Sequence, residues 1–153
     1  MTATLTSVPL AELASHVGTT FGPSSWREVT QEEVDRFADL TGDHNPVHLD
    51  EDFASRTPFG GTIAHGYLTL ALVVPLMAEI VEVTGVGTGV NYGLDRLRFP
   101  APVLVGSRIR ATSTLSAVTE VPGGYQAVFE NTIEAEGQAK PAAVAVMVVR
   151  YYA

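Results

Sequence analysis

Hydrophobic positions follow a helical period in the first third of the chain. Apolar and small side chains recur at i, i+3, i+4 and i+7, at Val34, Phe37, Ala38 and Thr41. Thr30 and Glu33 have the spacing of a capping box, and Gly42 stands where a left-handed residue ends a helix. The pattern predicts an amphipathic helix between Thr30 and Gly42, preceded by a short strand over 26–29.

A second stretch, from Tyr67 to Val83, is apolar on nearly all sides. It contains Pro75, Glu79 and Glu82, and it falls short of the roughly 20 apolar residues that a bilayer requires. A buried helix is therefore expected here instead of a membrane span. A helix that is hydrophobic all round needs other elements to enclose it.

The last third of the chain changes to a two-residue period. Alternation or β-branched enrichment marks 107–119, 124–136 and 142–152, with turn residues at 122–124 and 137–141. We expect long antiparallel strands that form a curved sheet around the single apolar helix, all within one domain over 1–153. One copy would leave a sheet edge and part of the helix uncovered, so a homodimer is expected.

Composition narrows the possible partners and chemistry. The 153 residues are 46% hydrophobic and carry a formal net charge of −8, which disfavours nucleic acid and anionic membrane surfaces. The chain has no cysteine, so disulfides, thiol nucleophiles and cysteine metal sites are excluded. The first residues lack the pattern of a signal peptide, and we expect a cytoplasmic protein.

The densest cluster of polar side chains lies between Thr41 and His48. It offers the carboxylate of Asp43, the imidazole of His48 and the amide of Asn45 on a segment that Pro46 predicts to be a loop. Ordinary structural roles are possible for each: an Asx turn or helix cap for Asp43, a turn for Asn45, and a surface ion pair for His48. A metal site is less expected, because no second ligand cluster follows at a suitable spacing.

The same segment resembles a known family signature. The run from Phe37 to His48, followed by five residues to Ala54, resembles the signature of the MaoC-like, (R)-specific enoyl-thioester hydratases. The resemblance continues over 59–68, 91–94 and 98–103. The family has the α+β hot-dog fold, in which an antiparallel sheet wraps a central helix, and this agrees with the arrangement expected from the hydrophobic pattern.

The resemblance implies a reaction and a set of site residues. The reaction is reversible addition of water to a trans-2-enoyl thioester of coenzyme A or acyl carrier protein, giving an (R)-3-hydroxyacyl thioester without cofactor or metal. Asp43 and His48 match the catalytic pair, and Asn45 matches the residue that supports them. Gly66 matches the position whose amide N–H binds the thioester carbonyl.

The chemical groups that hydration of an enoyl thioester needs are present among these residues. A base must take a proton from water as it attacks C3, and an acid must deliver a proton to C2. Charge that develops on the thioester oxygen needs hydrogen-bond donors, and the start of the expected buried helix near Gly66 supplies free backbone N–H groups. The sequence does not decide which of Asp43 and His48 is the base.

Several neighbouring residues are secondary candidates. His65 is either a thioester-binding residue or a structural histidine hydrogen-bonded within a dimer. Three aromatic residues are expected in the core but are also possible acyl contacts: Phe53, Phe59 and Tyr67. Three arginines are either contacts to coenzyme A phosphates or ordinary ion pairs: Arg56, Arg96 and Arg98.

Two other functions fit a hot-dog fold. A thioesterase would hydrolyse the thioester, but such enzymes typically lack the loop that holds Asp43 and His48. A non-catalytic subunit that binds an acyl thioester within a heterodimer would be expected to have lost one of the two. The presence of both residues favours the hydratase.

Overall fold

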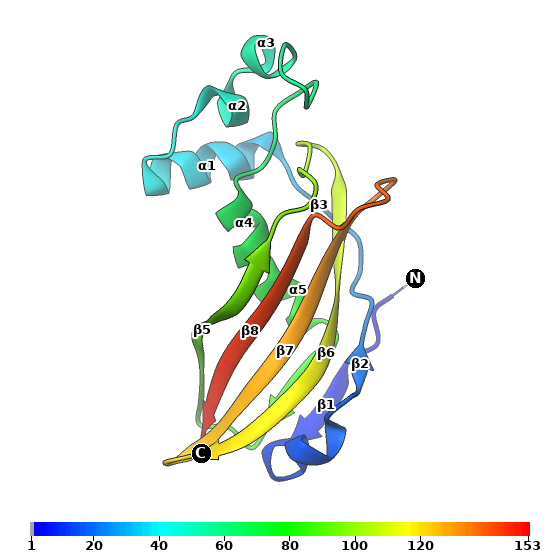
Figure 1. Cartoon of the computed structure of the whole chain (residues 1–153), viewed down its shortest axis with the longest axis vertical. Coiled ribbons are helices and arrows are strands. Elements are labelled where there is room, and N and C mark those ends of the chain that lie inside the picture. Colours follow the sequence, from blue (N-terminus) through cyan, green and yellow to red (C-terminus); the bar gives the residue numbers. More distant parts are fainter. Residues whose placement is uncertain (1) are drawn as a thin grey trace.

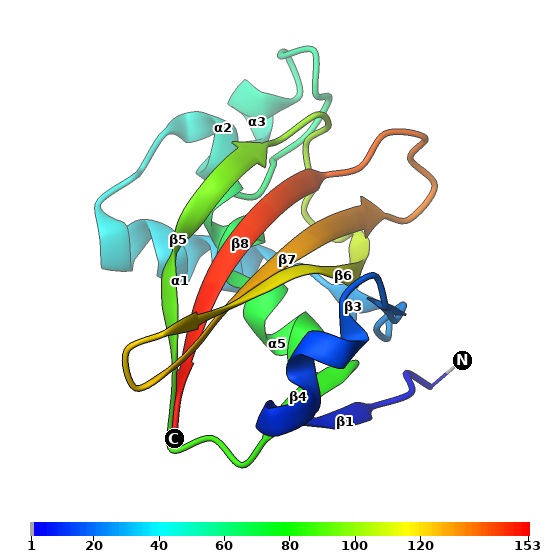
Figure 2. The ribbon, with the colours of Figure 1, turned by 60° about the horizontal axis from the view of Figure 1, so that its bottom comes forward.

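In the computed structural model, which describes residues 2–153, a six-stranded antiparallel sheet curves around two consecutive short helices (Figures 1 and 2). The strand order is β2-β6-β7-β8-β5, and β3 also pairs with β6. The strands are β2 (Thr20–Phe21), β3 (Arg27–Glu28), β5 (Thr88–Arg98), β6 (Arg108–Val121), β7 (Gly124–Ala135) and β8 (Ala143–Tyr152).

The three long strands match the predicted ones to within two residues. Along β6 and β7, buried and partly exposed residues alternate, so that one face of each strand packs on the helices. The turn between them is Pro122–Gly123, and Gly123 adopts a φ of 80° that favours glycine. The hydrophobic period therefore located the central part of the sheet correctly.

The edge strand β5 was not predicted. All its residues except Leu97 are exposed, so no alternation of buried and exposed positions marks it in the sequence. It pairs along its length with β8, with register shifts between Asn91 and Gly93 and between Leu94 and Arg96. Among the described residues no strand pairs with its other edge.

Helix α1 (Gln31–Thr41) confirms the first helix prediction. The Thr30 hydroxyl accepts from the Glu33 N–H while the Glu33 carboxylate accepts from the Thr30 N–H, which is the predicted capping box. Gly42 ends the helix with a φ of 80°. The predicted loop that follows is only partly right, because Pro46 begins a helical turn, α2 (Pro46–Leu49). The fixed φ of proline suits the first position of a helix.

The apolar stretch after residue 66 is not one helix. It forms α4 (Gly66–Ala71) and α5 (Val73–Ala78), and its last part is the strand β4 (Val81–Thr84). Pro75 has no N–H to donate to the Ala71 carbonyl four residues earlier, which accounts for the break between the helices. One side of the helices faces the sheet and the other is exposed, as expected of a single copy. No helix in residues 2–153 has the length and apolarity of a membrane span.

Two further parts complete the fold. Strand β4 pairs in parallel with β1 (Thr6–Pro9), which is followed by a 3-10 helix, η1 (Leu10–His16). Helices α1, α2 and α3 (Glu51–Ala54) lie together at one end of the sheet, next to the start of α4 (Figure 1). This placement brings the polar segment that follows α1 to the first residue of α4.

Candidate active site

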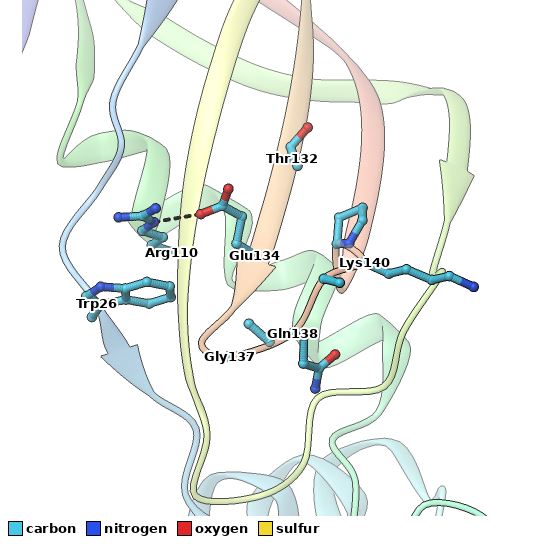
Figure 3. Close-up of a pocket in the computed structure, with 10 residues that line it drawn as sticks. Trp26, Arg110, Thr132, Glu134, Gly137, Gln138 and Lys140 are labelled. Carbon is cyan, nitrogen blue, oxygen red and sulfur yellow. Dashed lines mark hydrogen bonds and ion pairs between the residues drawn. The ribbon is translucent and has the colours of Figure 1, made fainter.

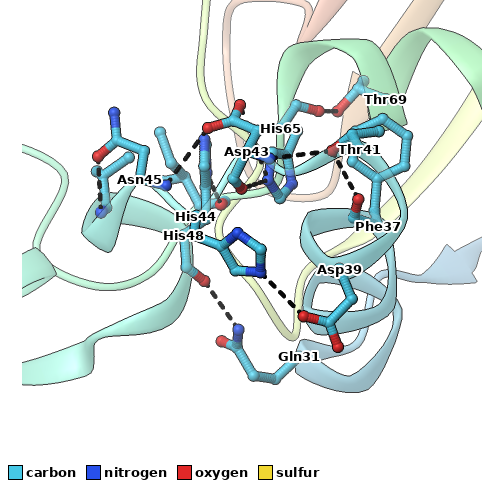
Figure 4. A network of polar contacts seen from close by, with 12 residues as sticks. Gln31, Phe37, Asp39, Thr41, Asp43, His44, Asn45, His48, His65 and Thr69 are labelled. Carbon is cyan, nitrogen blue, oxygen red and sulfur yellow. Dashed lines mark hydrogen bonds and ion pairs between the residues drawn. The ribbon is translucent and has the colours of Figure 1, made fainter.

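Three polar side chains from separate elements converge where α1, α2 and α4 meet. Asp43 follows α1, His48 lies in α2, and His65 is the residue immediately before α4 (Figure 4). One nitrogen of each imidazole and one carboxylate oxygen lie within 4.8 Å of one another. The structure thus brings together the predicted acid, the predicted imidazole and the start of the central helix.

His48 is buried, with 9% of its surface exposed, and its orientation is fixed. Its Nδ1 lies 2.7 Å from the carbonyl oxygen of Ile63. A carbonyl can only accept, so Nδ1 carries the hydrogen and Nε2 has a free lone pair when the ring is neutral. Burial lowers the pKa of His48, and nearby His65 lowers it further, against the opposing effects of Ile63 and Asp43. His48 is therefore not the surface ion-pair histidine considered as an alternative.

His65 is 2% exposed and packs against His48. The two rings are stacked, with centroids 3.8 Å apart and planes 28° apart, and the Phe37 ring lies 4.9 Å from His65. His65 Nε2 donates to the Asp43 carbonyl oxygen at 3.0 Å. The His65 side chain has a structural contact within the chain.

Asp43 and Asn45 also adopt the local roles weighed as alternatives. Asp43 Oδ1 accepts from the Asn45 N–H at 3.3 Å, and Asn45 Oδ1 accepts from the Val47 N–H at 3.2 Å, which caps α2. The Asp43 side chain is 54% exposed, and its Oδ2 lies 4.0 Å from His65 Nε2. One carboxylate oxygen thus shapes the loop while the other faces the imidazoles.

Gly66 is the first residue of α4, so its N–H has no acceptor within the helix. A Cβ atom at this position would lie 2.9 Å from the Phe99 ring. Phe99 directly follows β5, so the close approach also joins the end of the edge strand to the start of the helix. A side chain at this position would require the Phe99 ring to shift.

The three aromatic candidates are not core residues, and that expectation was wrong. Phe53 is 40% exposed, Phe59 41% and Tyr67 72%. They lie on short helices or loops at the surface of a single copy, where no second layer covers them. Tyr67 borders an apolar hollow of about 290 Å³ between α4 and β5. The other lining residues are Leu70, Ala71, Val74, Asn91, Gly93, Leu94 and Met147.

The arginine candidates differ from the other arginines in their partners. Four arginines each pair with a glutamate: Arg27, Arg36, Arg108 and Arg110. Arg56, Arg96 and Arg98 have no carboxylate partner within residues 2–153, and Arg98 donates to the Leu97 carbonyl oxygen. The ion-pair alternative is therefore wrong for these three within one copy.

Three residues that contact the site were not singled out from the sequence. Gln31 donates to the His48 backbone carbonyl, the Ile63 carbonyl accepts from the His48 ring, and the Thr62 hydroxyl donates to Gln31. Gln31 and Thr62 lie 31 positions apart, and no motif spacing connects them. Only the fold brings Gln31 and Thr62 together. The one local signal in the sequence is that Gln31 directly follows the residue that caps α1.

Another hollow, of about 310 Å³, lies beside the loop between β7 and β8 (Figure 3). Two of its charged groups are paired: Arg110 donates to Glu134 at 2.7 Å and lies 4.4 Å above the Trp26 ring. Lys140 extends toward its rim. The carboxylate in this hollow is held in an ion pair, so the cluster around His48 is the stronger candidate site.

The fold and this cluster define a hot-dog protein of the hydratase and dehydratase class. The chain is 52% identical to 3-hydroxyacyl-thioester dehydratase Z of Mycobacterium tuberculosis, over 94% of this chain and 96% of that protein. It is 30% identical to an (R)-specific enoyl-CoA hydratase of Rhodospirillum rubrum, over 73% and 74%. The structure of the (R)-hydratase from A. caviae matches with a TM-score of 0.71 and 30% identity, over 87% and 94%. The MaoC-like domain model matches residues 12–138, and the chain belongs to this family.

Proposed function

We propose that the chain catalyses the reversible hydration of trans-2-enoyl thioesters to (R)-3-hydroxyacyl thioesters. The observation that carries this proposal is the convergence of Asp43, His48 and His65 within 4.8 Å beside the start of α4. A carboxylate, an imidazole and free backbone N–H groups are the three components that the reaction needs. The names of the related proteins, a dehydratase and two (R)-hydratases, support a reversible reaction of this kind, and the two hydratase names support the (R) stereochemistry.

Asp43 and His48 hold the reacting water in this proposal. Because His48 Nδ1–H is committed to Ile63, its Nε2 accepts one water hydrogen. The Asp43 carboxylate accepts the other. As the water oxygen bonds to C3, Asp43 takes a proton from it, and the same carboxyl then delivers a proton to C2. The carbon–carbon double bond becomes single, and Asp43 returns to its starting carboxylate.

The thioester oxygen is held at the start of α4. Negative charge moves from C3 to this oxygen during attack, and the Gly66 N–H donates to it. The absence of a side chain at Gly66 lets the thioester approach the backbone. The His65 ring, which contacts Asp43 and His48, supports the two water-binding residues.

The remaining parts of the substrate are assigned from neighbouring surfaces. The apolar hollow bordered by Tyr67 begins one residue beyond Gly66 and suits the acyl chain. Phe53 and Phe59 offer further apolar contacts at the surface near α3. The unpaired Arg56, Arg96 and Arg98 suit the phosphates of coenzyme A or of a carrier-protein arm, because the protein has a net charge of −8.

A second copy of this chain is the proposed partner. Strand β5 presents one unpaired edge, and Val90, Tyr92 and Leu94 are exposed along it. Unpaired strand edges and apolar patches favour association through backbone hydrogen bonds and burial. Pairing at β5 would also cover part of the hollow next to α4, and so complete the wall around the acyl chain.

The direct test is an assay of purified protein with a short trans-2-enoyl-CoA. Hydration removes the absorbance of the conjugated thioester without releasing thiol, and the product is the (R)-3-hydroxyacyl thioester. Release of free thiol while the alkene persists would support a thioesterase instead. No reaction with the chain alone, and activity only after addition of a different hot-dog subunit, would support the heterodimer alternative.

A further inference from the structure

We propose that Gln31 is a positioning residue that holds the His48 imidazole in the orientation required to bind the reacting water. The inference rests on the proposed function, because it gives Gln31 a role in that same site. Gln31 is the first residue of α1, and it lies between the two backbone segments that hold His48 and Ile63. It does not contact the reacting groups of the substrate.

The Gln31 side chain makes hydrogen bonds to both segments. Its Nε2 donates to the His48 carbonyl oxygen at 2.8 Å, and its Oε1 accepts from the Thr62 hydroxyl at 2.8 Å. Thr62 precedes Ile63, whose carbonyl oxygen accepts from His48 Nδ1. Gln31, His48, Ile63 and Thr62 therefore form a closed ring of contacts around the hydrogen bond that orients the imidazole.

The other links between these segments are longer. The Ile63 N–H donates to the Val47 carbonyl at 3.2 Å, and the Thr62 N–H donates to the Glu51 carboxylate at 3.3 Å. Thr62 and His48 are both buried, so solvent does not readily replace a lost partner. Without Gln31, only these longer hydrogen bonds and the Nδ1–H bond itself join the segments, so the hold on one tautomer of His48 is weaker.

A substitution to glutamate separates this role from an ordinary role in starting the helix. Gln31→Glu keeps the length and the acceptor for Thr62, and a negative charge in the first turn favours a helix. It removes the N–H donor to the His48 carbonyl, and its charge repels that oxygen. Gln31 Nε2 also donates to Asp35 at 2.9 Å, so Asp35→Ala is a control that removes this contact and leaves the ring intact.

The experiment combines kinetics on a short enoyl-CoA with 15N NMR of His48 in the full chain. For Gln31→Glu we expect two tautomers of His48 in place of the Nδ1–H form, a kcat lower by about ten- to a hundredfold, and little change in KM. Thr62→Val, which breaks the ring on its other side, should act in the same direction. Asp35→Ala should match the wild type in both measurements.

Several results would overturn the inference. These are an unchanged His48 spectrum in Gln31→Glu, an equal effect of Asp35→Ala, or a wild-type spectrum of the Nε2–H form. A changed spectrum in a chain that hydrates no enoyl thioester would leave the positioning role standing and reject the proposed function. Normal hydration of the enoyl thioester by the wild-type chain, with an unchanged His48 spectrum in Gln31→Glu, would support the proposed function and reject the positioning role. Circular dichroism confirms that each variant is folded.

Discussion

Gly66 faces the ring of Phe99 so closely that a Cβ atom would lie 2.9 Å from Phe99 Cε2. We expect Gly66→Val to lower kcat/KM for an enoyl-CoA by about a hundredfold, because the branched side chain displaces Phe99 and occupies the approach to the N–H. The double variant Gly66→Val, Phe99→Ala removes the clash. If the double variant is as inactive as Gly66→Val, the valine itself blocks the approach of the thioester carbonyl to the N–H of residue 66. Wild-type kinetics in the single variant would exclude Gly66 from the thioester site.

Asp43→Asn and His48→Gln should each lower kcat by about two to four orders of magnitude, since each removes a group that holds or takes protons from water. The chain offers a matched control pair. Asp39 and His44 form an exposed ion pair at 2.9 Å on α1 and the same loop. Asp39→Asn and His44→Gln should leave kcat near the wild-type value. Equal losses in both pairs would mean that loop structure, not chemistry, accounts for the effect.

The pKa values of two histidines should be shifted in opposite directions from the ordinary value. The hydrogen bond to Asp39 raises the pKa of His44, whereas burial lowers that of His48. In an NMR titration we expect the midpoint of His44 above about 6.5 and that of His48 below it. Between the lowered pKa and about 6.5, the folded chain binds fewer protons at His48 than the unfolded chain. The contribution of His48 to the free energy of unfolding therefore decreases as the pH falls through that range.

The lowered pKa of His48 should also affect how activity depends on pH, because only the neutral ring can accept a hydrogen from the reacting water. Because burial lowers the pKa of His48, loss of activity from its protonation is expected at a lower pH than for a histidine with the ordinary pKa. A midpoint for His48 at or above that of His44 would contradict the assigned effect of burial.

The edge of β5 can be tested through the oligomeric state. Val90→Lys places a charge on the exposed strand and should convert a dimer to a monomer, as measured by sedimentation or light scattering. Leu40→Lys, at an exposed apolar position on α1, is the control and should remain dimeric. A wild-type chain that is monomeric at micromolar concentration would contradict the homodimer.

Arg98 should bind the coenzyme A portion of the substrate. We expect Arg98→Ala to raise KM for an enoyl-CoA by about tenfold, the effect of losing one charge-assisted hydrogen bond, with kcat little changed. The difference should shrink at high salt, because exposed charges are screened. Arg36→Ala, which removes an arginine already paired with Glu32, is the control. Equal KM values for both variants would reject this contact.

Local patterns predicted those parts of the fold whose cause is local. The capping box at Thr30, the left-handed Gly42 and the alternating strands β6 to β8 are present as expected. The break in the apolar helix and the helical turn at Pro46 were missed. Proline is the cause at both positions: Pro75 lacks the N–H that continues a helix, whereas the fixed φ of Pro46 suits the first position of one. Strand β5 was missed because an exposed edge strand has no buried face to impose alternation.

The residues of the candidate site also divide into those that a local motif reveals and those that only the packing of distant segments reveals. Asp43 and His48 lie on one short segment, so a motif reveals them. Gln31 and Thr62 act through contacts that arise only when α1, α2 and the segment before α4 pack together. The exposure of Phe53, Phe59 and Tyr67 likewise depends on how the elements pack together. Hydrophobicity alone does not distinguish a core aromatic from one at an interface.

The polar groups assigned to the reaction all lie between Asp43 and Gly66, whereas the apolar hollow is lined by α4, β5 and β8. In the proposed function, bond making and substrate length would thus depend on largely separate stretches of the chain. Substitutions such as those at Leu94 or Met147 can reshape the hollow while the acid and imidazole stay in place. This modular design offers a route to engineer variants that accept longer or shorter substrates through the same chemistry.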